Sequence, residues 1–93
     1  MRRRARVDAN HAAIVEALRA SGWHVHDCSR LGGGFPDLLA AKHGRIELIE
    51  VKDGAKVPSK QLLTMAEIKV CDALDKAGVR VRVVTSVDQA VNL

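Results

Sequence analysis

The distribution of apolar residues along the chain predicts one small α/β domain with elements in the order αβββαβα. An apolar stripe at helical spacing predicts a first helix over about residues 9 to 20, with buried positions at Ile14, Val15 and Leu18. Asp8 is expected to be the N-cap of this helix, and Gly22 stands just past its end.

Residues 23 to 28 alternate between apolar and polar side chains, which is typical of a strand with one wetter face. Trp23 and Val25 share the side expected to be buried, and the other side carries His24, His26 and Cys28. These three residue types bind zinc and leave open a zinc-stabilised binding module. However, the three positions of an extended strand span about 13 Å, so they reach one ion only if the strand bends.

Two apolar runs, residues 37 to 41 and 46 to 52, flank the turn signal His43-Gly44 and predict a β-hairpin. Leucine and isoleucine occupy both faces of these strands. Strands of this kind lie in the middle of a sheet that is covered by helices on both sides.

The second half of the chain predicts a helix, a strand and a short terminal helix. Thr64 and Glu67 form a capping box that starts a helix to about residue 77, and Gly78 follows it at the C′ position. The apolar stripe of this helix is Met65, Ile68, Cys71 and Leu74. Residues 79 to 84 are β-prone, and a second capping box, from Ser86 to Gln89, opens the last helix.

The hairpin brings acidic residues together. A turn of two or four residues centred on His43-Gly44 places Asp37 directly opposite Glu50, and Lys52 projects from the same face. Carboxylates about 5 Å apart at Cβ are a poor way to stabilise a sheet. Their repulsion is on the order of 4 kcal/mol at an effective dielectric of about 20. A divalent cation between them turns this cost into binding energy, so we expect an oxygen-ligand site for Mg²⁺ or Mn²⁺.

Such a site suits hydrolysis of a phosphodiester bond, because a bound metal lowers the pKa of a water molecule. Lys52 would orient that water or offset charge on the phosphate. The alternative is a chance pairing of Glu50 and Lys52 at the end of a buried strand. Burial of three ionisable groups without a function is costly, which favours the metal site.

The same residues resemble a known family. Pro36-Asp37, a spacer and Glu50-Val51-Lys52 are similar to the PD-(D/E)xK nuclease signature. The glycines that precede them, residues 32 to 34, and the small size of the chain resemble stand-alone phage-type members of the VRR-NUC family. This likeness runs from about Val7 to the C-terminus.

The resemblance implies a restriction-endonuclease-like core, αβββαβ(α), with a mixed central sheet flanked by helices. It implies that the backbone carbonyl of Val51 is a further metal ligand. It also implies a metal-dependent DNA endonuclease that acts as a homodimer on branched DNA such as four-way junctions. The alternative function is a non-catalytic nucleic-acid-binding domain that keeps the nuclease fold.

Related nucleases often add a polar residue from the first helix or from the start of the helix after the metal strand. Asn10 and His11 are the candidates in the first helix, whereas Glu16 falls on the side opposite the apolar stripe. A satisfied, partly buried histidine is the alternative for His11. At the later helix the candidates are Glu67 and Gln61, but a Glu67 that closes the capping box would not be free for catalysis.

Positive charge is concentrated at the N-terminus. Residues 1 to 7 form a basic arm with Arg2, Arg3, Arg4 and Arg6, whereas the remaining basic and acidic residues balance. A basic arm on a neutral body, residues 8 to 93, suits contact with DNA phosphates, although a solvated terminus is the alternative. Further candidate DNA contacts are Arg30, Gly33, Gly34, Lys56 and Lys60. For the basic residues the alternative is a solvated charge, and for the glycines it is a flexible connector.

Other classes of protein fit the composition poorly. Trp23 and Phe35 are the only aromatic residues of the three types Phe, Trp and Tyr, so base-stacking platforms for single strands are not expected. No apolar run approaches the about 20 residues that span a bilayer, so we expect no membrane partner. Cys28 and Cys71 fit reduced thiols, and we expect a cytoplasmic protein, either of a phage in its host or of a bacterium.

Overall fold

The computed structural model describes residues 9 to 56 and 62 to 93. The helices and strands follow the predicted order, αβββαβα. They are α1 (His11–Ala20), β1 (His24–Asp27), β2 (Leu38–Lys42), β3 (Arg45–Val51), α2 (Met65–Lys76), β4 (Val81–Val84) and α3 (Val87–Val91).

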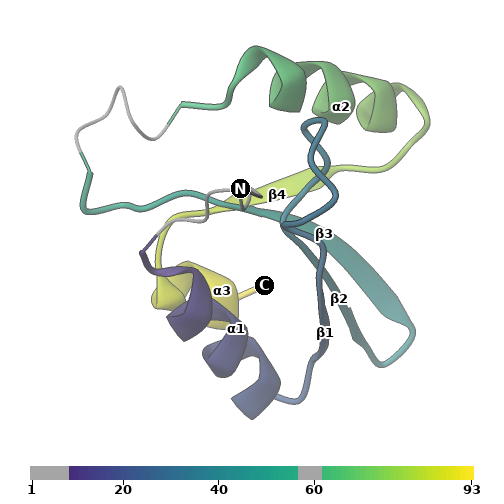
Figure 1. Cartoon of the computed structure of the whole chain (residues 1–93). Helices are drawn as coiled ribbons and strands as arrows, with labels where there is room; N and C mark the ends of the chain where they lie inside the picture. Colours follow the sequence, from purple (N-terminus) through teal and green to yellow (C-terminus); the bar gives the residue numbers. More distant parts are fainter. Residues whose placement is uncertain (1–8, 57–61) are drawn as a thin grey trace.

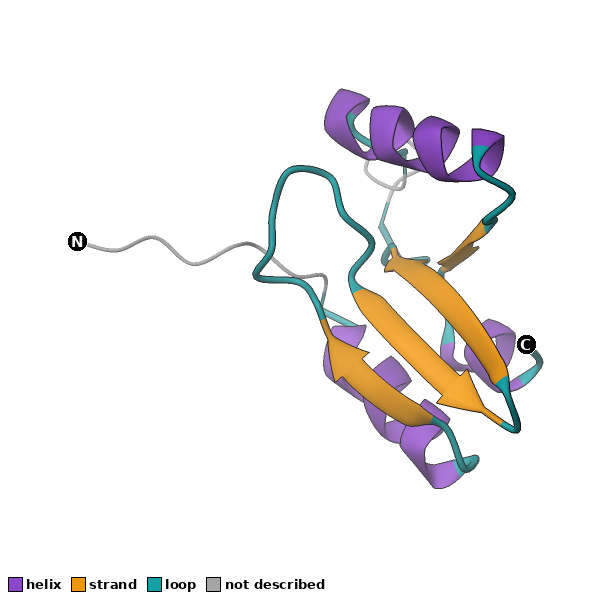
Figure 2. Cartoon of the chain, turned by 90° about the vertical axis from the view of Figure 1, so that its right-hand side faces the viewer, coloured by secondary structure: helices purple, strands orange, loops and turns teal. Residues whose placement is uncertain are grey.

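The four strands form one mixed sheet in the order β1-β2-β3-β4. The pairs β1–β2 and β2–β3 are antiparallel, whereas β3 and β4 run parallel through the α2 crossover. Helices α1 and α3 pack together on one side of the sheet, and α2 lies on the other side (Figures 1 and 2). The predicted mixed sheet flanked by helices is confirmed.

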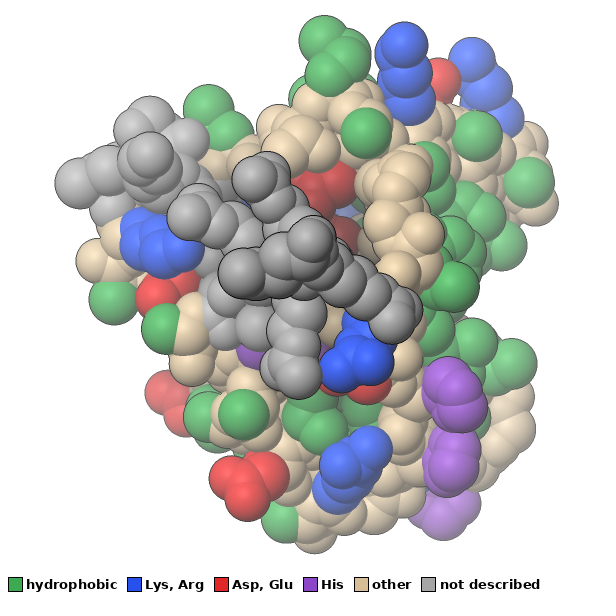
Figure 3. Space-filling model, viewed as in Figure 1, with side chains coloured by type: hydrophobic (Ala, Val, Ile, Leu, Met, Phe, Trp, Pro, Cys, Tyr) green, Lys and Arg blue, Asp and Glu red, His purple; other side chains and the backbone are tan. Residues whose placement is uncertain are grey.

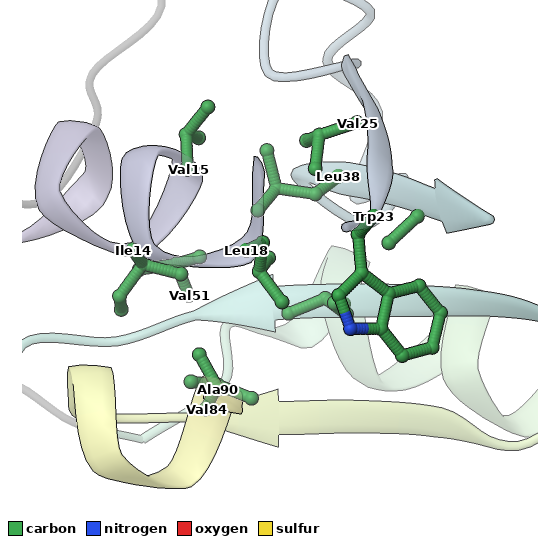
Figure 4. Close-up of a cluster of buried hydrophobic side chains, with 11 residues drawn as sticks. Ile14, Val15, Leu18, Trp23, Val25, Leu38, Val51, Val84 and Ala90 are labelled. Atoms are coloured by element: carbon green, nitrogen blue, oxygen red, sulfur yellow. The ribbon is translucent and has the colours of Figure 1, made fainter. Parts of the chain in front are cut away.

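The core lies between the sheet and the α1–α3 layer. Ile14 and Leu18 of α1 are fully buried, as their spacing predicted, and they pack against one face of the central strands (Figure 4). The other members of this cluster are Val15, Trp23, Val25, Leu38, Ala40, Ile49, Val51, Val84 and Ala90. Burial of each large side chain stabilises the fold by about 1.5–3 kcal/mol.

The hairpin has the register that the sequence predicted. Its turn is the two-residue form, with Lys42 opposite Arg45. Both turn residues have positive φ, +50° at His43 and +79° at Gly44, which is the conformation that matches the twist of paired strands.

The expected start of α1 is wrong by two residues. The helix begins at His11, its N-cap position is Asn10, and Asp8 lies outside the described residues. The Asn10 side chain does not cap its own helix, because its amide donates instead to the backbone carbonyls of Lys52 and Thr85. A tertiary contact has replaced the local cap.

Helix α2 lies on the other face of the sheet, as predicted, but covers that face only in part. No residue of α2 is buried. The inward side of the helix consists of Glu67, Val70, Cys71 and Leu74, each half-buried, whereas the predicted stripe residues Met65 and Ile68 are 67% and 47% exposed. The helix is rotated so that Glu67 faces the sheet.

We call three exposed side chains on the α2 side of the molecule the open apolar face: Ile46 of β3, Ile68 of α2 and Val83 of β4. Ile46 and Val83 alternate with core residues along their strands, so they point away from α1 and α3. Figure 3 shows apolar side chains exposed on the layer of α2.

The terminal capping box differs from its prediction in one bond. Ser86 accepts from the Gln89 amide as expected, but the Gln89 side chain accepts from the Thr85 amide and not from Ser86. Within the two described segments, no helix has the length and apolar character needed to cross a membrane.

Candidate active site

Asp37 and Glu50 meet at the end of the β2–β3 hairpin. Leu38 pairs with Ile49, so Asp37 and Glu50 face one another one step beyond this pair, as the sequence predicted. The Oδ2 atom of Asp37 accepts a hydrogen bond of 2.8 Å from the Val51 amide, which fixes the carboxylate against the strand end. Glu50 is only 3% exposed.

The surroundings of Glu50 oppose its ionisation. Burial, a hydrogen bond with Glu67 and the negative charge of Asp37 raise its pKa from 4.5 to about 10. The carboxyl therefore retains its proton at neutral pH in the absence of a compensating cation. A pair of carboxylates that cannot both ionise unaided is a suitable donor set for a hard divalent cation.

Lys52 is buried beside these two acids. Its Nζ atom lies 2.9 Å from Oε1 of Glu67 and 3.8 Å from Oε2 of Glu50. Burial of a lysine is costly unless it is paired, and here an acid from a different element provides the partner.

Glu67 brings α2 to the site. Its Oε1 atom accepts from the Thr64 amide at 2.8 Å, its own amide donates to Oγ1 of Thr64, and the predicted capping box is confirmed. The same oxygen also accepts from Lys52, so a glutamate that closes the capping box still contacts the site. Burial opposes ionisation of Glu67, but hydrogen bonds from Glu50, the Thr64 amide and Lys52 outweigh it and lower its pKa to about 2.

The fold of the chain is similar to that of a solved structure described as a VRR_NUC domain. The two are 30% identical with a TM-score of 0.66, and the match covers 89% of this chain and 87% of the other. This chain belongs to the VRR-NUC family. It is therefore a nuclease-type domain. No family model matches the sequence, and no curated protein matches it.

The first helix of this VRR-NUC domain contributes to the site through Asn10. Its side-chain amide donates to the carbonyls of Lys52 and Thr85, at 3.2 Å each. This contact fixes the backbone where β3 ends, directly after the acidic pair. Asn10 therefore supports the site from behind the strand.

The alternative of a satisfied, partly buried His11 is met only in part, because its Nδ1 atom is buried without a hydrogen bond to the described residues. His11 is buried, and its Nε2 atom lies 3.0 Å from Oδ2 of Asp27. Burial opposes ionisation of Asp27, but hydrogen bonds from Ser29 and the contact with His11 outweigh it and lower its pKa to about 2. Sequence reasoning missed Asp27, because only the packing of α1 on β1 brings the two residues together.

Gly34 packs closely against α2, and its contact with DNA stays a prediction. A Cβ atom at this position would overlap the backbone carbonyl group of Ala66 and lie 2.8 Å from the amide nitrogen of Glu67. Its φ of +86° also favours glycine. The loop before Asp37 thus packs directly on the first turn of α2. At Gly33 the space is open, and an approach of DNA there stays a prediction.

The predicted DNA contacts are only partly within the described residues. Arg30 and Lys56 are exposed in the loops before β2 and after β3, respectively, and their role stays a prediction. Figure 3 shows basic side chains spread over this face rather than gathered in one patch. The remaining candidates lie outside the described residues: Arg2, Arg3, Arg4, Arg6, Lys60 and Gln61.

The rival zinc site receives no support. Among residues 9–56 and 62–93, no three His, Cys, Asp or Glu residues are grouped so that they hold a metal ion. His24 and His26 are exposed with their rings 6.4 Å apart, and Cys28 follows the end of β1. An oxygen site at the two facing carboxylates and the backbone carbonyl of Val51 stays a prediction.

Proposed function

We propose that this VRR-NUC domain is a metal-dependent endodeoxyribonuclease whose catalytic residues are Asp37, Glu50 and Lys52. The observation that carries the proposal is the facing pair of Asp37 and Glu50, of which Glu50 is buried and has a pKa raised by burial and by the neighbouring acids. A divalent cation relieves the repulsion between the two acids, which explains why a small domain keeps them together.

The donor atoms favour Mg²⁺ or Mn²⁺, because both ions prefer oxygen ligands. Asp37 and Glu50 would hold the metal, with the backbone carbonyl of Val51 as a further ligand in keeping with the family resemblance. The bound metal supplies an activated water and offsets charge on the phosphate. Asp37 is held for this task by the Val51 amide, and the strand end is held by Asn10.

Lys52 provides the positive charge at the site. Its ammonium lies next to both Glu50 and Glu67 and is almost completely buried. Such a group would orient the attacking water or stabilise charge that develops on the phosphate. On this proposal it is a catalytic residue because it would contact the water or the phosphate.

The DNA substrate is branched, such as a four-way junction, and the protein acts as a homodimer. The support for branched DNA is the family resemblance together with the absence, within the described segments, of any element besides the αβββαβα core that would read bases. The open apolar face supports the homodimer, since a single chain leaves it uncovered. The N-terminal arginines would contact DNA phosphates.

The test is cleavage of flap, fork, four-way-junction and linear duplex DNA with Mn²⁺ or with EDTA. Wild-type protein should cut the four-way junction with Mn²⁺ and leave it intact in EDTA. Asp37→Asn should lower the single-turnover rate by more than about 100-fold, because changes behind the ligands of a metal site alone cost roughly 10- to 100-fold.

The matched control is Asp72→Asn, which removes an exposed acid on α2 that pairs with Lys76. This variant should cut at the wild-type rate. A protein that binds the junction equally in Mn²⁺ and EDTA, and never cuts, would be the non-catalytic binder. Preference for linear duplex would remove the branched-DNA part of the proposal.

A further inference from the structure

We propose that Glu67 is a positioning residue that holds the Lys52 ammonium away from Glu50 and so keeps Glu50 available to the metal. This inference rests on the proposed function and adds α2 to the active site. The inference is based on two distances: Nζ of Lys52 lies 2.9 Å from Oε1 of Glu67 and 3.8 Å from Oε2 of Glu50.

Glu67 is well placed to hold a charge because its own carboxylate is fixed. The Oε1 atom that accepts from Lys52 also accepts from the Thr64 amide at 2.8 Å, within the capping box. The Glu67 side chain is only 16% exposed. A carboxylate bonded to a helix N-terminus has few other positions, so the ammonium bonded to it is fixed as well.

The first turn of α2 is itself positioned by the loop that leads to Asp37. Gly34 lies against Ala66 and Glu67 so closely that a Cβ atom does not fit. The loop before Asp37 therefore sets the position of Glu67, and Glu67 sets the position of Lys52. The acidic pair and the lysine are connected through α2 as well as through β3.

The physical reason for this arrangement is competition between two cations. An ammonium and a divalent metal both seek the Glu50 carboxylate, and Lys52 is near enough to occupy it. A second carboxylate that binds the ammonium more closely reduces this competition. Without Glu67, Lys52 would turn to Glu50 and oppose metal binding. Besides burial, a hydrogen bond with Glu67 raises the pKa of Glu50, an effect that does not pass through Lys52, so the two effects are separated by comparing proteins with and without Lys52.

The experiment is a double-mutant cycle on Mn²⁺ affinity, measured by calorimetry without DNA. The four proteins are wild type, Glu67→Gln, Lys52→Met and the double variant. Gln at 67 keeps an oxygen that accepts from the Thr64 amide, and Met at 52 keeps the aliphatic packing. Asp72→Asn controls for the loss of a negative charge on the same helix.

Glu67→Gln should weaken Mn²⁺ affinity about fivefold when Lys52 is present, a coupling within the range for residues in contact. When Lys52→Met is already present, adding Glu67→Gln should weaken the Mn²⁺ affinity by a factor that is at least about threefold smaller, since the competing ammonium is gone. Lys52→Met alone should leave the affinity unchanged or tighten it. Thermal unfolding in EDTA should show all four proteins folded, and Asp72→Asn should bind Mn²⁺ like wild type.

Equal losses with and without Lys52 would overturn the proposal, because the effect of Glu67 would then reach the metal without Lys52, either directly or through its hydrogen bond with Glu50. The wild-type protein could bind Mn²⁺ and cleave DNA while the effects of Glu67→Gln and Lys52→Met on Mn²⁺ affinity are additive. That result would refute only the role of Glu67. A wild-type protein that does neither would refute the proposed function and this role with it.

Discussion

The charge of Glu50 depends strongly on its surroundings, and this dependence has a consequence for stability. Its pKa is raised from 4.5 to about 10, first by burial and then by the nearby Glu67 and Asp37 carboxyls. The folded state therefore binds a proton that the unfolded state releases above pH 4.5. The stabilisation from this proton is complete below pH 4.5 and is lost as the pH rises toward 10.

In EDTA, the free energy of unfolding should therefore fall as the pH rises from 5 to 8, with a slope from this one group of at most about 1.4 kcal/mol per pH unit. Glu50→Gln replaces the protonated acid by a neutral group of similar shape and should lack this part of the slope. Urea denaturation of both proteins across the pH range measures the difference. Parallel curves for the two proteins would contradict the assignment.

At low pH, the dependence of the free energy of unfolding on pH arises from acids with a lowered pKa; we call this part of the curve the acid limb. Glu67 and Asp27 both have a pKa of about 2, since hydrogen bonds to their ionised forms outweigh the effect of burial. Their contribution is present above the ordinary values near 4 and is lost as the pH falls toward 2. The Asp27 part of the acid limb does not depend on Glu50, so the wild type and Glu50→Gln should share it, whereas the Glu67 part should shrink in Glu50→Gln with the loss of the Glu50 hydrogen bond.

At the residue scale, the sequence predicted the pairing of Asp37 with Glu50, because the register of a hairpin follows from its turn alone. It did not predict the contact of Lys52 with Glu67 or of His11 with Asp27. These contacts join side chains from separate elements, and no local rule specifies how a helix is rotated about its axis. The ion pair with Lys52 and the capping box together determine that rotation for α2.

At the scale of elements, α2 has few apolar contacts and depends on its first turn. The Thr64–Glu67 capping box and the close packing of Gly34 on Ala66 hold this turn. Capping boxes are local sequence patterns, so α2 was predicted within one residue at each end. The start of α1 was predicted less well, because Asn10 bonds to distant carbonyls and not to its own helix.

Gly34→Ala should destabilise the domain by about 2 kcal/mol more than Gly32→Ala, which follows from the usual cost of overpacking. Both glycines have positive φ, +86° and +68°, so both variants share the strain of about 1 kcal/mol that a Cβ atom brings. Only at Gly34 does the new atom meet backbone, since nothing lies within 4 Å at Gly32. Urea denaturation of both variants in EDTA measures the difference.

The same comparison tests whether the glycine loop positions α2. Equal destabilisation by the two substitutions would mean that the first turn of α2 moves away at little cost. In that case Glu67 would not be held firmly enough to position Lys52.

At the scale of the whole molecule, the two sides of the sheet are unequal. On one side, α1 and α3 bury a continuous apolar cluster, which the helical and strand periodicities of the sequence predicted. On the other side, α2 leaves the open apolar face exposed, with Ile46 at 67%, Ile68 at 47% and Val83 at 45%. Periodicity identifies an apolar face but does not indicate whether the same chain or a second chain covers it.

The proposed homodimer gives this face a partner. A standard interface takes about 800 Å² from each partner, roughly an eighth of the 6435 Å² surface of this chain. A two-fold dimer uses the same patch on both copies, so a charge placed in it enters the interface twice. In light scattering after size exclusion, the wild type should show about twice the chain mass of 10.1 kDa.

Ile46→Glu and Ile68→Glu should each shift the protein to the mass of one chain, because each places a charge in the interface of both copies. The matched control is Val91→Glu on α3, which is similarly exposed, at 41%, but lies in the opposite layer. It should leave the mass unchanged.

A wild-type protein at the mass of one chain would contradict the proposed homodimer. A dimer broken only by Val91→Glu would instead place the interface on the α1–α3 side. Thermal unfolding of each variant separates loss of the dimer from loss of the fold, since an exposed position on a monomer tolerates glutamate with a change within about 0.5 kcal/mol.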